Sequence, residues 1–505
     1  MKSIKRSPFS LPLLSGALLV LIQPPVSLSY LAFFALIPLF YSLDEGSFRR
    51  SLISGYITGV ACYLGLIYWV IVAMHKYGGI NIYLSFLILM LFVFYMATYT
   101  ACFALGIMFL QNKFSIPFYL TAPPIWIMLE YLRGALLTGF PWSFLAHSQY
   151  NFLPFIQVAS ITGTYFISFL IVAVNAIAFT LLRRRKISLV YSAVIFVLLL
   201  SSITYGIAKL HSQDSGGLKA AIIQGNIAQD VKWDEAFKVK TVNTYYQATV
   251  NTDKDVNIVV WPETAIPVIF DQEPNVKTYI GSLPSITGAL LLFGTVSRTA
   301  DNRLYNSAYV LGPDNREEGR YSKGHLVPFG EYTPLRSWLS FLEKLSEKLS
   351  MQVGEFFPGE NHEPVCTDKG RIGMLICYEG VFPYITRETV QRGAQVLVNI
   401  TNDAWYDRTS APYQHLAFYV FRAVESDRFV LRAANTGISA IIDPQGRIRK
   451  KTPIFEPAVL TGEFTLKETK TLYIRYGDYF VTLCVIFLAA LILASPKVRA
   501  YRRRP

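Results

Sequence analysis

Three reactive side chains follow short apolar runs in the second half of this 505-residue chain. Glu263 stands in Trp-Pro-Glu-Thr-Ala, Lys323 in Tyr-Ser-Lys-Gly-His-Leu-Val-Pro-Phe-Gly-Glu-Tyr, and Cys377 in Ile-Cys-Tyr-Glu. A thiolate is a strong nucleophile, and a neighbouring carboxylate can take its proton as a general base. A fixed ammonium group can stabilise the oxyanion of a tetrahedral intermediate. These residue types are therefore the parts of covalent acyl chemistry.

Each of these residues also has an ordinary structural interpretation. Glu263 alone fits a carboxylate at a helix start, Lys323 a solvated surface lysine, and Cys377 a buried, inert thiol. An oxidising compartment would permit a disulfide between Cys366 and Cys377, but Cys377 ends a strand-like run, which favours a fixed position instead. We expect no metal and no cofactor, because no Cys-x-x-Cys or His-rich spacing occurs.

The stretch that carries these residues alternates short apolar strands with helical patterns. The predicted strands, rich in Val, Ile and Leu and bounded by Gly, Pro, Asn and Asp, lie at 218–227, 256–262, 289–295, 304–311, 371–377, 396–401, 439–442 and 459–464. The helical patterns lie near 234–250, 273–282, 383–392 and 412–427. We therefore expect an α/β domain with buried sheets, whose functional groups gather at strand ends and in the loops that follow them.

The rest of the chain is unusually apolar. The whole sequence is 52% hydrophobic and only 16% charged, whereas a soluble domain carries about 25% charged residues. Segments long enough, or nearly long enough, to span a bilayer lie at 9–24, 27–43, 52–75, 81–110, 115–134, 155–182, 187–208 and 474–495. The first two are short and are joined by Pro24-Pro25, so a re-entrant or tilted pair is an alternative to two full spans.

The net charge of +13 lies between the apolar segments rather than on the α/β stretch. The cations follow the second, fourth and sixth segments and close both ends of the chain, as the positive-inside rule requires. A nucleic-acid binder would place them on its folded domain, so we exclude that function. We predict seven spans in 1–208, an outer domain at 209–473, and a last span with a basic cytoplasmic tail at 474–505. A secretory signal is the alternative for the N-terminus, but further spans follow and no Ala-x-Ala site stands after Ile22.

The sequence motifs around the three reactive residues resemble those of the Glu–Lys–Cys triad of the nitrilase superfamily, in that chain order. The flanking motifs resemble those of one membrane-bound family within it, the apolipoprotein N-acyltransferases of bacterial envelopes. The matching motifs include Gly139-Phe140-Pro141-Trp142, Gln224-Gly225-Asn226-Ile227, Lys232-Trp233, Asn402-Asp403-Ala404-Trp405, Arg432-Ala433-Ala434-Asn435 and Asp443-Pro444-Gln445-Gly446. One departure is Asp407-Arg408, where the family usually has glycine after the aromatic pair, so the shape of that loop is left open.

The resemblance implies a polytopic α-helical membrane domain of eight spans and an extracytoplasmic nitrilase-like αββα sandwich. It implies that Cys377 takes an acyl chain from a membrane phospholipid as a thioester and passes it to the α-amine of a diacylglyceryl-cysteine apolipoprotein. Glu263 would be general base and acid, and Lys323 the oxyanion stabiliser. The supporting and substrate-binding residues would be Glu331, Tyr378, Glu379, Trp233, Phe329 and Trp405. The expected location is the bacterial inner membrane, with the catalytic domain in the periplasm, and we expect a monomer.

The amphipathic segment 335–349 fits either an arm that dips into the membrane interface or an ordinary helix packed on the domain. Three other functions remain as alternatives. A membrane-tethered amidase or nitrilase would use the same triad with water as the acceptor. A transporter would carry paired charges within its spans, of which the sequence has few. A lipoprotein-binding module with a dead site is disfavoured by the intact trio.

Overall fold

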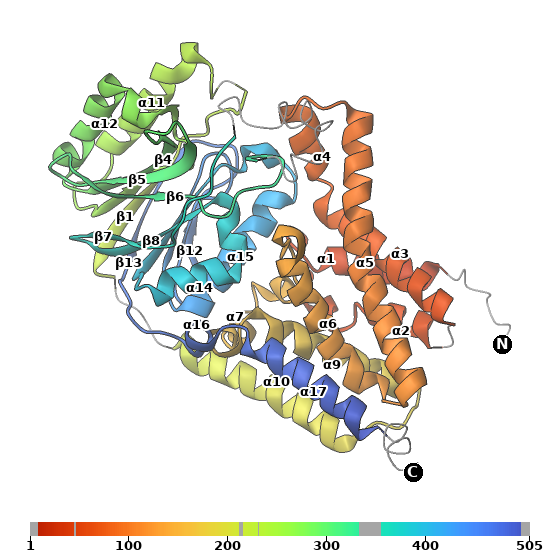
Figure 1. Ribbon diagram of the computed structural model, residues 1–505. Helices are drawn as coiled ribbons and strands as arrows, with labels where there is room; N and C mark the ends of the chain where they lie inside the picture. Colours follow the sequence, from red (N-terminus) through yellow and green to blue (C-terminus); the bar gives the residue numbers. More distant parts are fainter. Residues whose placement is uncertain (1–8, 45–46, 212–215, 231, 333–354, 496–505) are drawn as a thin grey trace. The chain divides into compact units, whose positions relative to one another are not determined.

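The computed structural model of the protein describes residues 9–44, 47–211, 216–230, 232–332 and 355–495, so the segment predicted at 335–349 lies outside the described residues (Figure 1). The chain divides into two compact units. Unit 1 contains the described residues up to 68, residues 86–211 and those from 476 onward. Unit 2 contains residues 69–85 and the described residues of 212–475.

Unit 1 is helical, and each predicted apolar segment contains helix. Its main helices are α1 (Ser10–Leu21), α2 (Ile37–Leu43), α3 (Phe48–Ile67), α5 (Ile82–Phe114), α6 (Phe118–Ala135), α9 (Thr164–Leu182), α10 (Leu189–Leu210) and α17 (Tyr479–Ala494). Among the described residues, four helices are long and apolar enough to cross a membrane: α3, α5, α9 and α10. The helical, membrane-type character of this unit is therefore confirmed, whereas eight crossings stay a prediction.

The predicted span at 155–182 is not a continuous helix. The segment expected at 155–182 is divided into α7 (Leu153–Ile156), α8 (Ala159–Thr162) and α9, and Gly163 lies between the last two with φ +71°. Glycine adopts this backbone conformation without the steric penalty that a side chain would bring. The apolar run hides this break because hydropathy alone does not register a change of helix direction.

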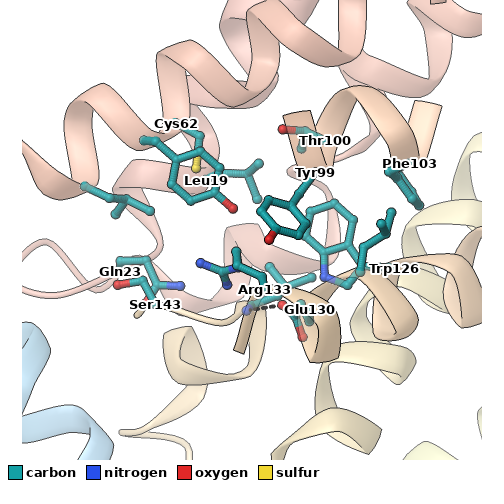
Figure 2. Close-up of a pocket in the computed structure, with 14 residues that line it drawn as sticks. Leu19, Gln23, Cys62, Tyr99, Thr100, Phe103, Trp126, Glu130, Arg133 and Ser143 are labelled. Carbon is teal, nitrogen blue, oxygen red and sulfur yellow. Dashed lines mark hydrogen bonds between the residues drawn. The ribbon is translucent and has the colours of Figure 1, made fainter. Parts of the chain in front are cut away.

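The interior of unit 1 contains a small cavity of about 40 Å³, and Figure 2 shows the side chains that line it. Glu130 and Arg133, both 4% exposed, lie one turn apart on α6. Oε1 of Glu130 accepts the Leu145 N–H at 2.8 Å, and Nη1 of Arg133 donates to the Trp142 carbonyl at 2.8 Å. The two charged residues therefore hold the backbone of the 142–145 segment, and each meets a polar partner in an apolar interior.

Unit 2 contains two β-sheets. The seven-stranded sheet has the order β13-β1-β2-β4-β5-β6, with β3 paired to β4, and the six-stranded sheet has the order β12-β11-β10-β9-β8-β7. The first sheet consists of β1 (Leu218–Gln224), β2 (Ile258–Val260), β3 (Ile266–Ile269), β4 (Leu290–Arg298), β5 (Leu304–Leu311), β6 (Glu317–Ser322) and β13 (Ala458–Phe464). The second consists of β7 (Val365–Thr367), β8 (Gly370–Ile376), β9 (Val396–Thr401), β10 (Val430–Ala434), β11 (Ala440–Ile442) and β12 (Ile448–Lys451).

The two sheets pack face to face, with helices on their outer faces (Figure 1). Helices α11 (Glu235–Val250) and α12 (Pro274–Thr287) lie on the first sheet, and α14 (Pro383–Gln391) and α15 (Ala411–Ser426) on the second. Alternate residues of a strand point to opposite faces, so Ile222 enters the core between the sheets while its neighbour Ile223 packs beneath the helices. This arrangement is the αββα sandwich that was predicted, and it brings the ends of β2, β6 and β8 together.

Candidate active site

The three predicted reactive residues all follow strands of unit 2 and are all buried. Glu263 lies three residues after β2, Lys323 directly after β6, and Cys377 directly after β8. Their exposed fractions are 3%, 1% and 7%. Burial at these positions excludes the solvated interpretation of Lys323 and makes the electrostatic environment of each group decisive.

Glu263, Lys323 and Glu331 form one charged cluster. Nζ of Lys323 lies 2.9 and 2.8 Å from the two carboxylate oxygens of Glu331 and 3.8 Å from Oε1 of Glu263. Burial opposes the charged form of Lys323, but the negative charges of Glu331 and then Glu263 outweigh it and raise the lysine pKa above its ordinary value. The cluster therefore favours the ammonium form of Lys323, which is the form that can stabilise an oxyanion.

Asn306 of β5 bridges the two carboxylates. Its side-chain amide nitrogen donates to Oε1 of Glu263 at 2.7 Å and to Oε1 of Glu331 at 2.9 Å. Its backbone carbonyl accepts the Lys323 N–H at 2.9 Å. One strand residue therefore fixes both carboxylates and the main chain of the lysine, which makes the cluster rigid before substrate enters.

The main chain around Glu263 is closely enclosed. Gly294 of β4 lies against it, and a Cβ atom at Gly294 would stand 2.6 Å from Cα of Glu263 and 2.6 Å from the Thr264 nitrogen. Thr264 adopts φ +46°, which turns the chain sharply after the glutamate. The second carboxylate oxygen, Oε2, accepts the Asn402 N–H at 2.9 Å. Glu263 is therefore held from β4, from β5 and from the loop after β9.

Cys377 stands on a strained turn between β8 and a short 3-10 helix, with φ +51°. Its carbonyl accepts the hydroxyl of Tyr419 on α15 at 2.8 Å, which anchors the turn. Burial, reinforced by the negative charge of Glu263, raises the pKa of the Cys377 thiol, whereas Lys323 acts in the opposite direction. The resting residue is accordingly a neutral thiol, and it needs a base to remove its proton before it can attack.

Glu379 joins the turn of Cys377 to the segment of Lys323. Oε2 of Glu379 accepts the Ile376 N–H at 2.7 Å, while Oε1 accepts the Gly324 N–H at 2.7 Å and the Tyr321 hydroxyl at 2.7 Å. Burial raises the pKa of Glu379 to about 7 even though these donors favour its carboxylate form. Glu379 therefore links the two strand ends, and the supporting role expected of it stays a prediction.

Tyr378 is buried beside the nucleophile and lies in a ring cluster. Its ring centroid is 4.9 Å from that of Phe382 and 5.8 Å from that of His325. His325 is the residue two positions after Lys323, so this cluster packs the same two segments together. Burial, followed by the charge of Lys323, lowers the pKa of His325 to about 4, which makes this histidine neutral and structural at ordinary pH.

Of the three expected substrate-binding residues, Trp233 and Phe329 lie in loops and Trp405 lies in a short 3-10 helix, Asp403–Tyr406. Trp233 is half-buried and packs against a cluster that includes Leu326 and Phe356. Phe329 is 39% exposed and has φ +63°. Trp405 is half-buried, and its ring lies 5.9 Å from that of Tyr77. Their partial exposure is what a wall for an apolar chain needs, but their binding role stays a prediction.

The loop that departs from the family pattern has a defined shape here. Asp407 adopts φ 50° and ψ −156°, a conformation that favours glycine. Its carboxylate forms an ion pair with Lys76 and accepts the Arg408 N–H at 2.8 Å. Lys76 belongs to the 69–85 segment, which is part of unit 2. An aspartate with local partners therefore occupies the position at which glycine was expected.

Sequence reasoning missed two polar residues that touch the cluster. Asn306 lies inside a strand that was predicted from its apolar character, and nothing in the sequence marks its amide as a contact of Glu263. Lys232 was noted only as part of a matching motif, yet its ammonium donates to the main-chain carbonyl of Glu263 at 3.1 Å. The signal that could have found Lys232 is its place directly before Trp233, a predicted site residue.

Comparison with known families divides the chain in a similar way. The family profile described as carbon-nitrogen hydrolase matches residues 219–473, and the profile described as apolipoprotein N-acyltransferase N-terminal domain matches residues 15–177. The first match contains Glu263, Lys323 and Cys377. The second lies in the helical part of the chain.

Related proteins match over almost the whole length. The chain is 40% identical over 495 residues to the apolipoprotein N-acyltransferase of Geobacter metallireducens, covering 96% of this chain and 94% of the relative. It is 32% identical over 504 residues to that of Azotobacter vinelandii, with coverages of 97% and 96%. Among solved structures, a variant of the nitrilase-superfamily amidase of Nesterenkonia AN1 is 18% identical with a TM-score of 0.41, covering 54% of this chain and 98% of that one.

Proposed function

The chain belongs to the apolipoprotein N-acyltransferase family and is therefore an acyltransferase, and from this premise we propose that it transfers an acyl chain by way of a thioester on Cys377. The donor is a membrane phospholipid, and the acceptor is the α-amine of a diacylglyceryl-cysteine at the N-terminus of an apolipoprotein. The observation that supports the assignment most strongly is the buried cluster of Glu263, Lys323 and Glu331 beside a cysteine that is neutral at rest.

In the first half-reaction, Glu263 removes the proton of the Cys377 thiol as the sulfur attacks the ester carbonyl of the phospholipid. The carbonyl oxygen becomes an oxyanion, which the Lys323 ammonium stabilises. The intermediate collapses with cleavage of the ester carbon–oxygen bond, and the leaving oxygen of the lysophospholipid takes the proton back from Glu263. The product on the protein is an acyl thioester.

In the second half-reaction, the acceptor α-amine attacks the thioester carbonyl. An α-amine titrates near pH 7.7–8.0, so much of it is uncharged and nucleophilic at about neutral pH. Glu263 takes a proton from the attacking nitrogen and returns it to the departing Cys377 sulfur, which leaves an amide on the acceptor and regenerates the thiol. Glu331 and Asn306 keep Lys323 and Glu263 in place throughout.

The proposed location follows from the substrates. A phospholipid acyl donor is embedded in a bilayer, and the apolar helices of unit 1 would keep the enzyme at the same membrane. We place it in the bacterial inner membrane with unit 2 on the periplasmic side. The loops between apolar segments that hold the basic residues would then lie in the cytoplasm, as the positive-inside rule requires. The enzyme is proposed to act as a monomer.

The test is an acyl-transfer assay on the full-length protein in phospholipid vesicles with a diacylglyceryl-cysteine peptide. The proposal predicts an N-acylated peptide and a lysophospholipid, both absent for Cys377→Ala, and slow release of free fatty acid when no peptide is added. Fast fatty-acid release that the peptide does not alter would instead support a membrane-tethered hydrolase that uses water as the acceptor. Retained transfer by Cys377→Ala would contradict the thioester.

A further inference from the structure

A second buried lysine lies beside the proposed catalytic cluster. Lys232, in the loop before α11, is 1% exposed, and its ammonium donates to the main-chain carbonyl of Glu263 at 3.1 Å. Within the part of the chain that the structure describes, it forms no ion pair, whereas Lys323 contacts Glu331. A buried charge that forms no ion pair is costly, so folding stability does not explain a lysine at this position.

The loop that carries Lys232 is attached to the residues that hold the Glu263 carboxylate. The side-chain amide of Asn402 donates to Oε1 of Gln229 at 2.7 Å, and the Asn402 N–H donates to Oε2 of Glu263. Trp233, the next residue, packs into the cluster that contains Leu326. The loop is therefore held on both sides of Lys232, at Gln229 and at Trp233.

Two titratable groups from neighbouring elements face this lysine. Glu263 follows β2 and Cys377 follows β8; the negative charge of Glu263, and that of Cys377 once its thiol is ionised, favours the charged form of Lys232. Burial is the larger effect and lowers the pKa of Lys232 to about 7. The interaction with Cys377 works in reverse, so a charged Lys232 favours the thiolate form of Cys377.

We propose that Lys232 is a positioning residue for acyl transfer: it fixes the main chain of Glu263 and supplies a positive charge that favours ionisation of the Cys377 thiol. The inference rests on the proposed function, because it concerns the step in which that thiol loses its proton. Lys323 and Lys232 then have different duties. The charged Lys323 is paired with the carboxylates of Glu331 and Glu263 and stabilises the oxyanion. Lys232 instead favours ionisation of the Cys377 thiol and fixes the main chain of Glu263.

The experiment measures single-turnover acylation of Cys377 by phospholipid vesicles, followed by intact-protein mass, at about pH 6 and about pH 8.5. A neighbouring opposite charge shifts a pKa by roughly 1–3 units, so we expect acylation of Lys232→Met to be slower by about tenfold or more at the lower pH. The deficit should shrink at the higher pH, because the wild-type lysine has lost its own proton there. Lys240→Met, an exposed position on α11, is the matched control and should acylate as wild type.

Lys232→Arg provides a second readout that does not depend on the folding of the methionine variant. Arginine keeps its charge at both pH values, so the rate of this variant relative to wild type should rise between the lower and the higher pH. Wild-type acylation by Lys232→Met, or a deficit equal at both pH values with no relative rise for Lys232→Arg, would overturn the inference. If wild type itself takes no acyl group, the proposed function fails instead.

Discussion

The side-chain amide of Asn306 lies 2.7 Å from Oε1 of Glu263, and the same nitrogen lies 2.9 Å from Oε1 of Glu331. One amide thus donates to the proposed general base and to the carboxylate that neutralises Lys323. Because both acceptors are buried and charged, the two hydrogen bonds belong to the stronger class. They allow two carboxylates to share a small space with a single ammonium group.

Replacing Asn306 with alanine should slow the acylation of Cys377 without unfolding the protein. A hydrogen bond to a charged group contributes about 1.5–3 kcal/mol, which corresponds to a loss of roughly 10- to 100-fold in single-turnover rate. Asn306→Asp should be slower still, since it adds a third carboxylate to the cluster. Asn243→Ala serves as the control, because among the described residues its exposed side chain has a hydrogen bond only with Tyr279. A wild-type rate for Asn306→Ala would refute the role of this bridge.

Gly294→Ala should displace the general base. The added Cβ would stand 2.6 Å from Cα of Glu263, and backbone atoms cannot move aside as the end of a side chain can. We expect a lower unfolding temperature, equivalent to about 1–3 kcal/mol of overpacking, and a fall in kcat with little change in KM for vesicles. Gly217→Ala, where no atom lies within 4 Å of the new Cβ, is the control. Equal behaviour of the two variants would show that the close approach has no consequence for catalysis.

Asp407→Gly should raise the unfolding temperature or leave it unchanged. A residue with a side chain at φ 50° and ψ −156° carries backbone strain of about 1–3 kcal/mol, whereas a surface ion pair such as that with Lys76 contributes about 0–1 kcal/mol. The backbone strain is the larger of the two contributions, so its relief by glycine should stabilise the fold more than the loss of the ion pair destabilises it. Lys76→Met keeps the strain and removes the partner, so it should unfold at a lower temperature than wild type. Thermal unfolding with the opposite ranking would contradict this interpretation of the loop.

Lys232→Met should stabilise the protein most at low pH. The folded-state pKa of Lys232 is lowered to about 7, so from that pH up to the ordinary lysine value the unfolded chain binds a proton that the folded chain does not. Wild-type stability therefore rises with pH over this window, and the cost of the buried charge is fully present below it. Each unit of pKa shift corresponds to about 1.4 kcal/mol, so the advantage of the methionine variant should be several kcal/mol at about pH 6 and fade toward about pH 10. Unfolding temperatures measured across this range would contradict the account if methionine is destabilising throughout.

Local sequence patterns were sufficient to predict most of the strands and helices of the αββα sandwich. All eight predicted strands and all four predicted helices of unit 2 are present within a few residues of their expected bounds. Three of the five strands that were missed break the apolar pattern for identifiable reasons. β6 (Glu317–Ser322) is mostly polar, β3 (Ile266–Ile269) contains a proline, and β10 (Val430–Ala434) contains the buried Arg432, whose charge is met by Asp403 at 2.7 Å.

The reactive residues of the site were predictable, but their partners were not. Glu263, Lys323 and Cys377 stand out because each follows the end of a strand and belongs to a recognisable sequence motif, and functional residues gather at such strand ends. The contacts of Asn306 and Lys232 depend on which strands become neighbours and on how a loop folds back, and a single sequence does not encode these in any local spacing. The same is true of Lys76, which lies more than 300 positions before its partner Asp407.

The account depends on an acyl group that is held covalently by Cys377, and mass spectrometry of the full-length protein tests this directly. After incubation with phospholipid vesicles and no acceptor, the protein should gain the mass of one acyl chain, and proteolysis should place that mass on the peptide containing Cys377. Addition of a diacylglyceryl-cysteine peptide should remove it. An unmodified protein that still transfers acyl chains, or an adduct located on Cys366, would contradict the central claim.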